Sequence, residues 1–185
     1  MNLPNVITVT RILLIPVFIG LYMAQQDWSI FAASVLFALA ALTDWLDGYL
    51  ARRLNQTTPF GAFLDPVADK LIVVSALIVL VAYHSNMWLT LPGLVIVGRE
   101  IVISALREWM ADMDDSVAVA VSYLGKIKTT AQMIAITLLL AQPVGVESVY
   151  LQVAYVLLYL AAVMTLWSMW QYLSAAWSAL SRGLR

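Results

Sequence analysis

The sequence predicts an all-α integral membrane protein, with six transmembrane helices around an intramembrane polar cavity that opens to the cytoplasm. Two observations support this fold class. Of the 185 residues, 63% are hydrophobic and only 11% are charged, whereas soluble domains have roughly 25% charged residues. The apolar residues also form several stretches, each near the ~20 residues that a helix needs to cross a bilayer. Little length remains for a soluble domain, so residues 1–185 are expected to form one membrane domain.

Short polar breaks separate the six expected helices. Pro4 suits a helix-initiating turn, and Pro66 is tolerated because it lies in the first turns of its helix. Trp167, Trp170 and Trp177 are expected to anchor the end of the last helix at a membrane interface. The expected helices cover residues 7–23, 29–54, 60–83, 88–110, 117–141 and 149–180.

The distribution of Lys and Arg predicts the orientation. An even number of spans brings both ends of the chain to one side, and the turns at 25–28, 83–87 and 142–148 contain no Lys or Arg. Because positive residues are enriched in cytoplasmic loops, both termini are expected in the cytoplasm. The positive residues near the other loops and ends are Arg11, Arg52, Arg53, Lys70, Arg107, Arg182 and Arg185.

Four aspartates occur within or beside apolar stretches, where a carboxylate is unfavourable and usually functional. Asp44 and Asp47 share one helical stripe with Gly48, Ala51 and Arg52, at i, i+3, i+4, i+7 and i+8. Asp65 and Asp69 are i, i+4 on the next helix. If the two stripes face each other, four carboxylates meet.

Only one positive residue, Arg52, lies on these stripes, so two divalent cations are expected to supply the missing charge, because hard cations prefer oxygen ligands. Gly48 and Ala51 carry little side-chain bulk, which predicts close approach of a flat or phosphate-bearing ligand such as a nucleotide. The alternative is that the carboxylates only cap helices or pair with Arg52, Arg53 and Lys70.

These residues and Gly61 fit the pattern D-x2-D-G-x2-A-R-x8-G-x3-D-x3-D at every fixed position. In this pattern the chain resembles the CDP-alcohol phosphatidyltransferase family. The resemblance implies that a CDP-linked lipid gives its phosphatidyl group to an alcohol and releases CMP. It also implies a homodimer and two Mg²⁺ or Mn²⁺ ions. The implied roles are metal binding by Asp44, Asp47, Asp65 and Asp69, general-base catalysis by Asp69, and CDP binding by Gly48, Ala51, Arg52 and Gly61.

Residues 2–8, 98–108 and 125–132 resemble the bacterial branch of this family that forms phosphatidylglycerophosphate. That resemblance implies CDP-diacylglycerol as donor, sn-glycerol 3-phosphate as acceptor, and the bacterial inner (cytoplasmic) membrane as location. Independently, a phosphorylated acceptor needs a cationic pocket. Lys126 and Lys128 are two residues apart, so we expect one of them to face the cavity. The residues expected to bind the acceptor phosphate are Arg99, Arg107, Lys126 and Lys128.

Several alternatives remain open at this point. The acceptor could be serine or inositol phosphate, or the chain could be a divalent-cation transporter, although a transporter does not need the Gly, Ala and Arg positions of the pattern. Arg11 either snorkels to the membrane surface or faces the site. His84 is expected in a turn, where a histidine is ordinarily solvated. No nucleic-acid partner is predicted.

Overall fold

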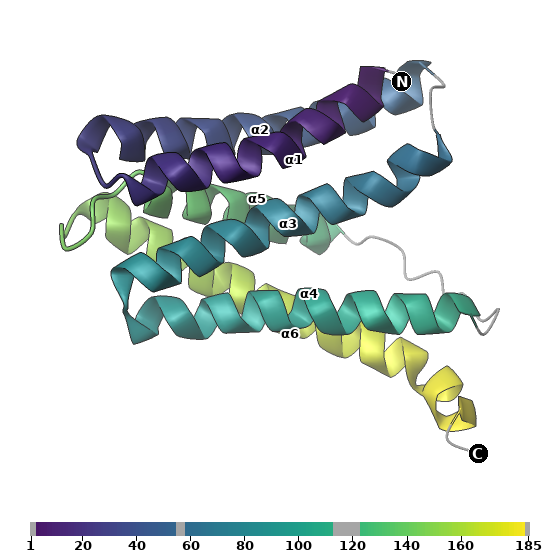
Figure 1. Ribbon diagram of the computed structural model, residues 1–185. Helices are drawn as coiled ribbons and strands as arrows, with labels where there is room; N and C mark the ends of the chain where they lie inside the picture. Colours follow the sequence, from purple (N-terminus) through teal and green to yellow (C-terminus); the bar gives the residue numbers. More distant parts are fainter. Residues whose placement is uncertain (1–2, 55–57, 113–122, 184–185) are drawn as a thin grey trace.

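The computed structural model of the chain describes residues 3–54, 58–112 and 123–183, and within them it contains six α-helices and no strand. Successive helices run in opposite directions, so that α1 begins and α6 ends at the same end of the bundle (Figure 1). We call this the terminal end, and the opposite end, with the connections at 24–26, 85–86 and 141–148, the turn end. The helices are α1 (Leu3–Met23), α2 (Asp27–Leu54), α3 (Pro59–His84), α4 (Met87–Asp112), α5 (Tyr123–Leu140) and α6 (Val149–Gly183).

Local signals explain where α3 begins and ends. The side chain of Thr58 caps its N-terminus by accepting a hydrogen bond from the backbone N–H of Gly61, and Pro59 occupies the first turn, where its missing N–H is harmless. At the other end Ser85 has φ 46° and donates its backbone N–H to the carbonyl of Val81, a left-handed C-cap. His84 is therefore the last residue of α3, and its expected place in a turn was wrong by one residue.

The six helices pack in a ring whose order differs from the chain order. Around the ring, neighbours in contact are α1, α2, α5, α6, α4, α3 and again α1, and α3 also contacts α5. Helix α1 thus packs against both α2 and α3, the two helices that carry the acidic pattern. Side chains in the first turns of α1, on the face that meets α3, can therefore reach the acids at the beginning of α3.

The apolar core occupies the half of the bundle nearest the turn end. Helix α1 contributes Ile15, Phe18 and Tyr22, and the rings of Phe18 and Phe37 meet edge to face with centroids 6.0 Å apart. In lipid, burying apolar side chains contributes little to helix association, because the lipid tails are equally apolar. Small residues that let the helices pack closely therefore matter most. Buried alanines at the core are Ala33, Ala40, Ala76, Ala135, Ala154 and Ala162.

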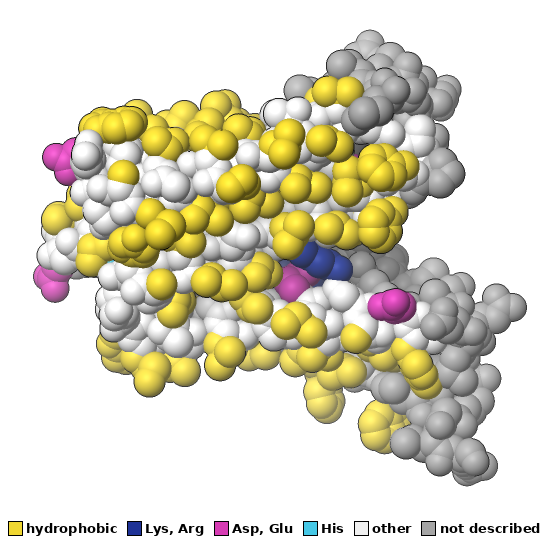
Figure 2. All heavy atoms as spheres, in the orientation of Figure 1, with side chains coloured by type: hydrophobic (Ala, Val, Ile, Leu, Met, Phe, Trp, Pro, Cys, Tyr) yellow, Lys and Arg dark blue, Asp and Glu magenta, His cyan; other side chains and the backbone are white. Residues whose placement is uncertain are grey.

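Within the described residues, four helices are long and apolar enough to cross a membrane: Asn5–Met23, Phe63–His84, Met87–Met110 and Val149–Ser174. The described apolar parts of α2 and α5 are shorter, Asp27–Thr43 and Ile127–Leu140. Large apolar side chains also cover much of the outer surface in Figure 2, and Leu13, Phe31 and Leu94 are among the exposed ones. The chain is therefore a multi-pass membrane protein built from helices.

Candidate active site

The first half of the acidic pattern lies in α2, which continues as one helix to Leu54. This backbone agrees with the helical spacing from which the stripe was predicted. The side chains of several predicted site residues are nevertheless outside the described part of the structure, and their contacts stay predictions. They are Asp44, Asp47, Gly48, Ala51 and Arg52 of α2, Arg107 of α4, and Lys126 of α5.

The second half of the pattern is fully described, and its two carboxylates are contacted from α1. Asp65 Oδ1 accepts a hydrogen bond of 2.7 Å from Thr8 Oγ1. One turn further along α3, Asp69 Oδ1 lies 3.6 Å from Nη1 of Arg11. Helix α1 therefore supplies a partner to each of the acids predicted on α3.

Arg11 is almost completely buried, with 1% of its side chain exposed, whereas 46% of the Asp69 side chain is exposed. A snorkelling arginine keeps its guanidinium in water, so the structure decides in favour of the site-facing alternative. It also corrects the charge count made from the two acidic helices alone. Arg52 is not the only positive residue available to the carboxylates, because α1 brings a second one from outside the pattern.

The sequence did contain a signal for this contact. Thr8, Arg11, Ile15, Phe18 and Tyr22 are spaced by alternating three and four residues, which places them along one seam of α1, and all five are buried. Polar residues that continue an apolar seam are expected to face inward with it. Applied to α1, that rule would have assigned Arg11 to the bundle interior.

Gly61 lies directly beneath the side chain of Asn5. A Cβ atom at Gly61 would be 2.7 Å from Asn5 Oδ1, closer than packed atoms allow. Asn5 also exchanges hydrogen bonds with the helix cap, because its Nδ2 donates to Thr58 Oγ1 at 3.0 Å and Thr58 Oγ1 lies 3.1 Å from Oδ1. The close approach of α1 thus favours a glycine here independently of the predicted contact with CDP, because a Cβ would displace the hydrogen-bonded side chain of Asn5.

The α3 carboxylates are suited to hold a divalent cation. An ionised carboxylate has about four acceptor positions, and the hydrogen bond from Thr8 uses one of those on Asp65. Nearly half of the Asp69 side chain is exposed. Among the side chains that the structure describes, no three His, Cys, Asp or Glu residues converge, and Asp44 and Asp47 are not in that set. The pair is therefore half of the predicted ligand set, with the oxygen chemistry that Mg²⁺ and Mn²⁺ prefer.

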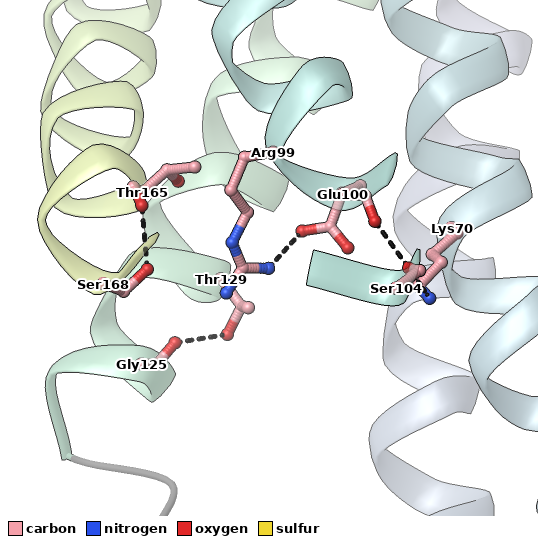
Figure 3. Close-up of polar contacts among 8 residues, drawn as sticks. All are labelled: Lys70, Arg99, Glu100, Ser104, Gly125, Thr129, Thr165 and Ser168. Atoms are coloured by element: carbon pink, nitrogen blue, oxygen red, sulfur yellow. Dashed lines mark hydrogen bonds and ion pairs between the residues drawn. The ribbon is translucent and has the colours of Figure 1, made fainter. Parts of the chain in front are cut away.

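Charged residues also line a hollow between α3 and α4 toward the terminal end (Figure 2). Arg99 Nη1 donates to Glu100 Oε1 at 2.6 Å, and the two side chains are 11% and 21% exposed. Lys70 of α3 donates to Ser104 Oγ of α4, on the other side of Glu100 from Arg99 in Figure 3. Arg99 is therefore inside the bundle as predicted, and a carboxylate already balances its charge.

Lys128 of α5 is buried, with 5% of its surface exposed, and Gln132 one turn later is buried as well. The lysine lines a cavity of about 200 Å³ between α5 and α6. The remaining lining residues are Gly125, Val163, Met164, Trp167, Ser168 and Gln171. Lys128 is therefore buried, and because the side chain of Lys126 lies outside the described part of the structure, which of the two lysines faces the predicted cavity stays a prediction.

His84 belongs to the opposite half of the molecule. Its Nε2 lies 3.2 Å from the hydroxyl of Tyr22, which is fully buried, while His84 itself is half-buried. Along α3 it is about 22 Å from Asp69, at 1.5 Å per residue. It joins α1 to α3 at the turn end and is remote from the acids.

Comparison with known sequences extends these observations. A sequence model described as CDP-alcohol phosphatidyltransferase matches residues 1–167. A protein of Pseudomonas fluorescens is 57% identical over 178 residues, which cover 96% of this chain and 91% of the relative. Proteins of Escherichia coli strain K12 and of Shigella flexneri are each 52% identical over 176 residues, or 95% of this chain and 94% of the relative. All three carry the name "CDP-diacylglycerol--glycerol-3-phosphate 3-phosphatidyltransferase".

Proposed function

Because this chain belongs to the CDP-alcohol phosphatidyltransferase family, we propose that it transfers the phosphatidyl group of CDP-diacylglycerol to sn-glycerol 3-phosphate. The products are phosphatidylglycerophosphate and CMP, and the step belongs to phospholipid biosynthesis. The observation that carries this assignment is the extent of the likeness: relatives named for this reaction match 95–96% of the chain at 52–57% identity. The geometry agrees, because the α3 carboxylates of the family pattern lie at the contact between two helices of a membrane bundle.

The reaction breaks one P–O bond and forms another. A hydroxyl oxygen of the acceptor attacks the phosphorus that carries the diacylglycerol, the bond from that phosphorus to the oxygen of CMP breaks, and CMP leaves with the electron pair. Asp69 is the proposed general base that takes the hydroxyl proton, and its open carboxylate is accessible to a substrate. Gly48, Ala51, Arg52 and Gly61 are proposed to seat the CDP portion.

We assign the metal ligands to Asp44, Asp47, Asp65 and Asp69, which would hold two Mg²⁺ or Mn²⁺ ions. When bound, such cations stabilise the negative charge that accumulates on the phosphates during transfer. The described half of this ligand set supports the assignment, because Asp65 and Asp69 are adjacent on α3 and both are fixed from α1.

The acceptor's phosphate is proposed to bind a cationic pocket formed by Arg99, Arg107, Lys126 and Lys128. Burial of Arg99 and Lys128 supports this pocket, since lipid-facing or loop cations would be exposed. A charge-assisted hydrogen bond to phosphate is roughly twice as strong as a neutral one. An uncharged acceptor such as serine would not need so many cations.

We further propose that the chain crosses a bacterial inner membrane six times, with both termini in the cytoplasm and a cavity that opens to the cytoplasm. Residues 1–185 are proposed to form one domain, and two copies of the chain to form a homodimer. The alternating helix directions and the Lys- and Arg-free turns support this topology. A reporter that is active only in the periplasm, fused after Arg185, is expected to stay inactive. Periplasmic activity would overturn the orientation, and a monomer by light scattering in detergent would overturn the dimer.

The deciding experiment uses the purified protein with CDP-diacylglycerol, Mg²⁺ and labelled glycerol 3-phosphate. We expect labelled phosphatidylglycerophosphate and an equal amount of CMP, and no product after metal chelation. Serine and inositol phosphate in parallel reactions test the other acceptors. Cation flux into liposomes without any CDP-lipid, in a protein that forms no CMP, would favour the transporter instead.

A further inference from the structure

Three residues on the buried seam of α1, Asn5, Thr8 and Arg11, form what we call the polar seam. All three are buried, and each contacts the beginning of α3. Asn5 bonds to Thr58, Thr8 to Asp65, and Arg11 to Asp69. From this geometry we infer that Thr8 and Arg11 are positioning residues, which hold the α3 carboxylates in the orientation that binds divalent cations. The inference rests on the proposed metal site.

A purely structural role explains this seam poorly. Removing a guanidinium from water is costly, and an apolar residue of similar size commonly packs at least as well as a buried ion pair. The same seam of α1 continues with Ile15, Phe18 and Tyr22, where apolar packing to the rest of the bundle suffices. Along this seam of α1, the buried cation therefore lies where the helix meets the two acids.

The exposure of the ion pair is also uneven in an informative way. The cation is buried and its carboxylate partner is 46% exposed. A pair that served to hide charge would bury both partners. Here a buried guanidinium lies against one oxygen of Asp69, while nearly half of the Asp69 side chain remains exposed.

Asp65 is held in a comparable way but by a neutral donor. The hydroxyl of Thr8 donates to Oδ1 at 2.7 Å, so its bond stabilises one carboxylate rotamer without adding charge. Partners that orient metal ligands typically contribute 10–100-fold to metal affinity or activity. Both contacts act on the Oδ1 atoms of acids one helical turn apart, which fixes the two carboxylates relative to each other.

The test compares Mn²⁺ binding to purified variants, measured by the electron paramagnetic resonance of free Mn²⁺, with steady-state kinetics. Thr8→Val and Arg11→Met are expected to weaken Mn²⁺ binding by about 10–100-fold and to lower kcat more than they raise the KM of glycerol 3-phosphate. Arg11→Lys keeps the charge but loses the planar fork, so partial recovery of Mn²⁺ binding is expected. Thr10→Val is the matched control, because Thr10 lies on the same helix, is exposed and bonds only to the carbonyl of Val6 within its own helix.

Unchanged Mn²⁺ binding in folded Thr8→Val and Arg11→Met would overturn the inference. Tighter binding in Arg11→Met would also overturn it, since Arg11 would then be a competitor of the cation. If Arg11→Met does not fold, Thr8→Val alone decides, because it removes a hydroxyl without removing a charge. A wild-type protein that binds Mn²⁺ with the expected Thr8 dependence but does not use glycerol 3-phosphate would overturn only the proposed acceptor.

Discussion

Along α1, the buried seam is polar from Asn5 to Arg11 and apolar from Ile15 to Tyr22, and the whole bundle divides in the same way. Toward the terminal end, buried or half-buried acids and cations join α1 to α3 and α3 to α4. Toward the turn end, aromatic and aliphatic side chains pack around small alanines. Buried charged groups are unfavourable at membrane depth, so the charged contacts among the described residues of the terminal half agree with the chemistry proposed there, while the turn-end half carries the apolar core.

This comparison predicts that substitutions in the terminal half lower turnover, whereas substitutions in the turn-end half lower stability. Asp65→Asn keeps the side-chain shape but removes the charge that a cation needs, and several kcal/mol of transition-state stabilisation depend on it. Since about 1.4 kcal/mol is tenfold in rate, turnover should fall about a thousandfold or more, with little change in thermal stability. The measurement is kcat at saturating Mg²⁺ beside a melting curve.

Asp27→Asn is the matched control for Asp65, because Asp27 is an exposed aspartate at the turn end of α2. It should leave kcat unchanged and alter stability by less than about 1 kcal/mol, the scale of a helix-terminus effect. Near-normal turnover of folded Asp65→Asn would end the metal assignment.

Phe37→Ala tests the apolar half. Phe37 is fully buried against Phe18, and comparable truncations in protein cores cost about 3–5 kcal/mol through the cavity that they leave. We expect the lower end of that range, with both KM values preserved well below the melting temperature. Phe31→Ala on the same helix is the control, because Phe31 is exposed toward lipid. Equal destabilisation by both variants would contradict the assigned core.

Arg99→Gln tests whether the cations of the terminal half bind the acceptor. The KM of glycerol 3-phosphate should rise at least about tenfold, which corresponds to ~1.4 kcal/mol of lost binding, while the KM of CDP-diacylglycerol stays nearly constant. Glu100→Gln removes the partner of Arg99 but keeps the cation, so it should not raise the acceptor's KM. Arg182→Gln near the C-terminus is a second control. A rise in the KM of the CDP-lipid instead would place Arg99 in the nucleotide site.

The smallest effect is expected at the link between α1 and α3 near the turn end. His84→Phe removes the partner of the Tyr22 hydroxyl, and a net hydrogen bond is worth about 1 kcal/mol. Stability should fall by about that amount, with kcat unchanged. Adding Tyr22→Phe should restore part of the loss, because no buried hydroxyl is then left without its partner. A large loss of kcat in His84→Phe would show that the two halves are not independent.

Much of the fold could be predicted from the sequence because membrane helices carry strong local signals. Five of the predicted helices begin within about four residues of those observed, and the largest difference among them is at α1, which starts at Leu3. The predicted start of the fifth helix, residue 117, lies outside the described residues. Pro4 lies inside its first turn, where proline is favourable. The spacing of Asp65 and Asp69 likewise placed both on one helix correctly.

The contacts of α1 could not be predicted from the spacing of the acids, because they depend on the order of helices around the ring. Arg11 by itself suits a snorkelling residue as well as a site residue, and only its packing against α3 distinguishes the two. Gly61 was predicted to contact the CDP portion of the substrate. The approach of Asn5 to Gly61 is a tertiary contact, which no local sequence pattern contains. The pairing of Arg99 with its neighbour Glu100 also depends on which rotamers the interior allows.

The burial of Arg11 has a consequence for biosynthesis. Helix α1 is made first, and Asp69 is made only after the whole of α2, so a nascent α1 enters the bilayer with a cation whose α3 partner does not yet exist. An arginine at the centre of a membrane helix costs about 3 kcal/mol at insertion; Arg11 lies nearer the N-terminal end of the Asn5–Met23 span, so its cost should be smaller, and the emerging α3 can relieve it. A ribosome-bound chain that ends after α2 should therefore hold α1 in the membrane less firmly than one that ends after α3, a difference measurable by alkaline extraction, and Arg11→Leu should remove it. The charge that serves the finished site would thus also make retention of the first helix depend on arrival of the third.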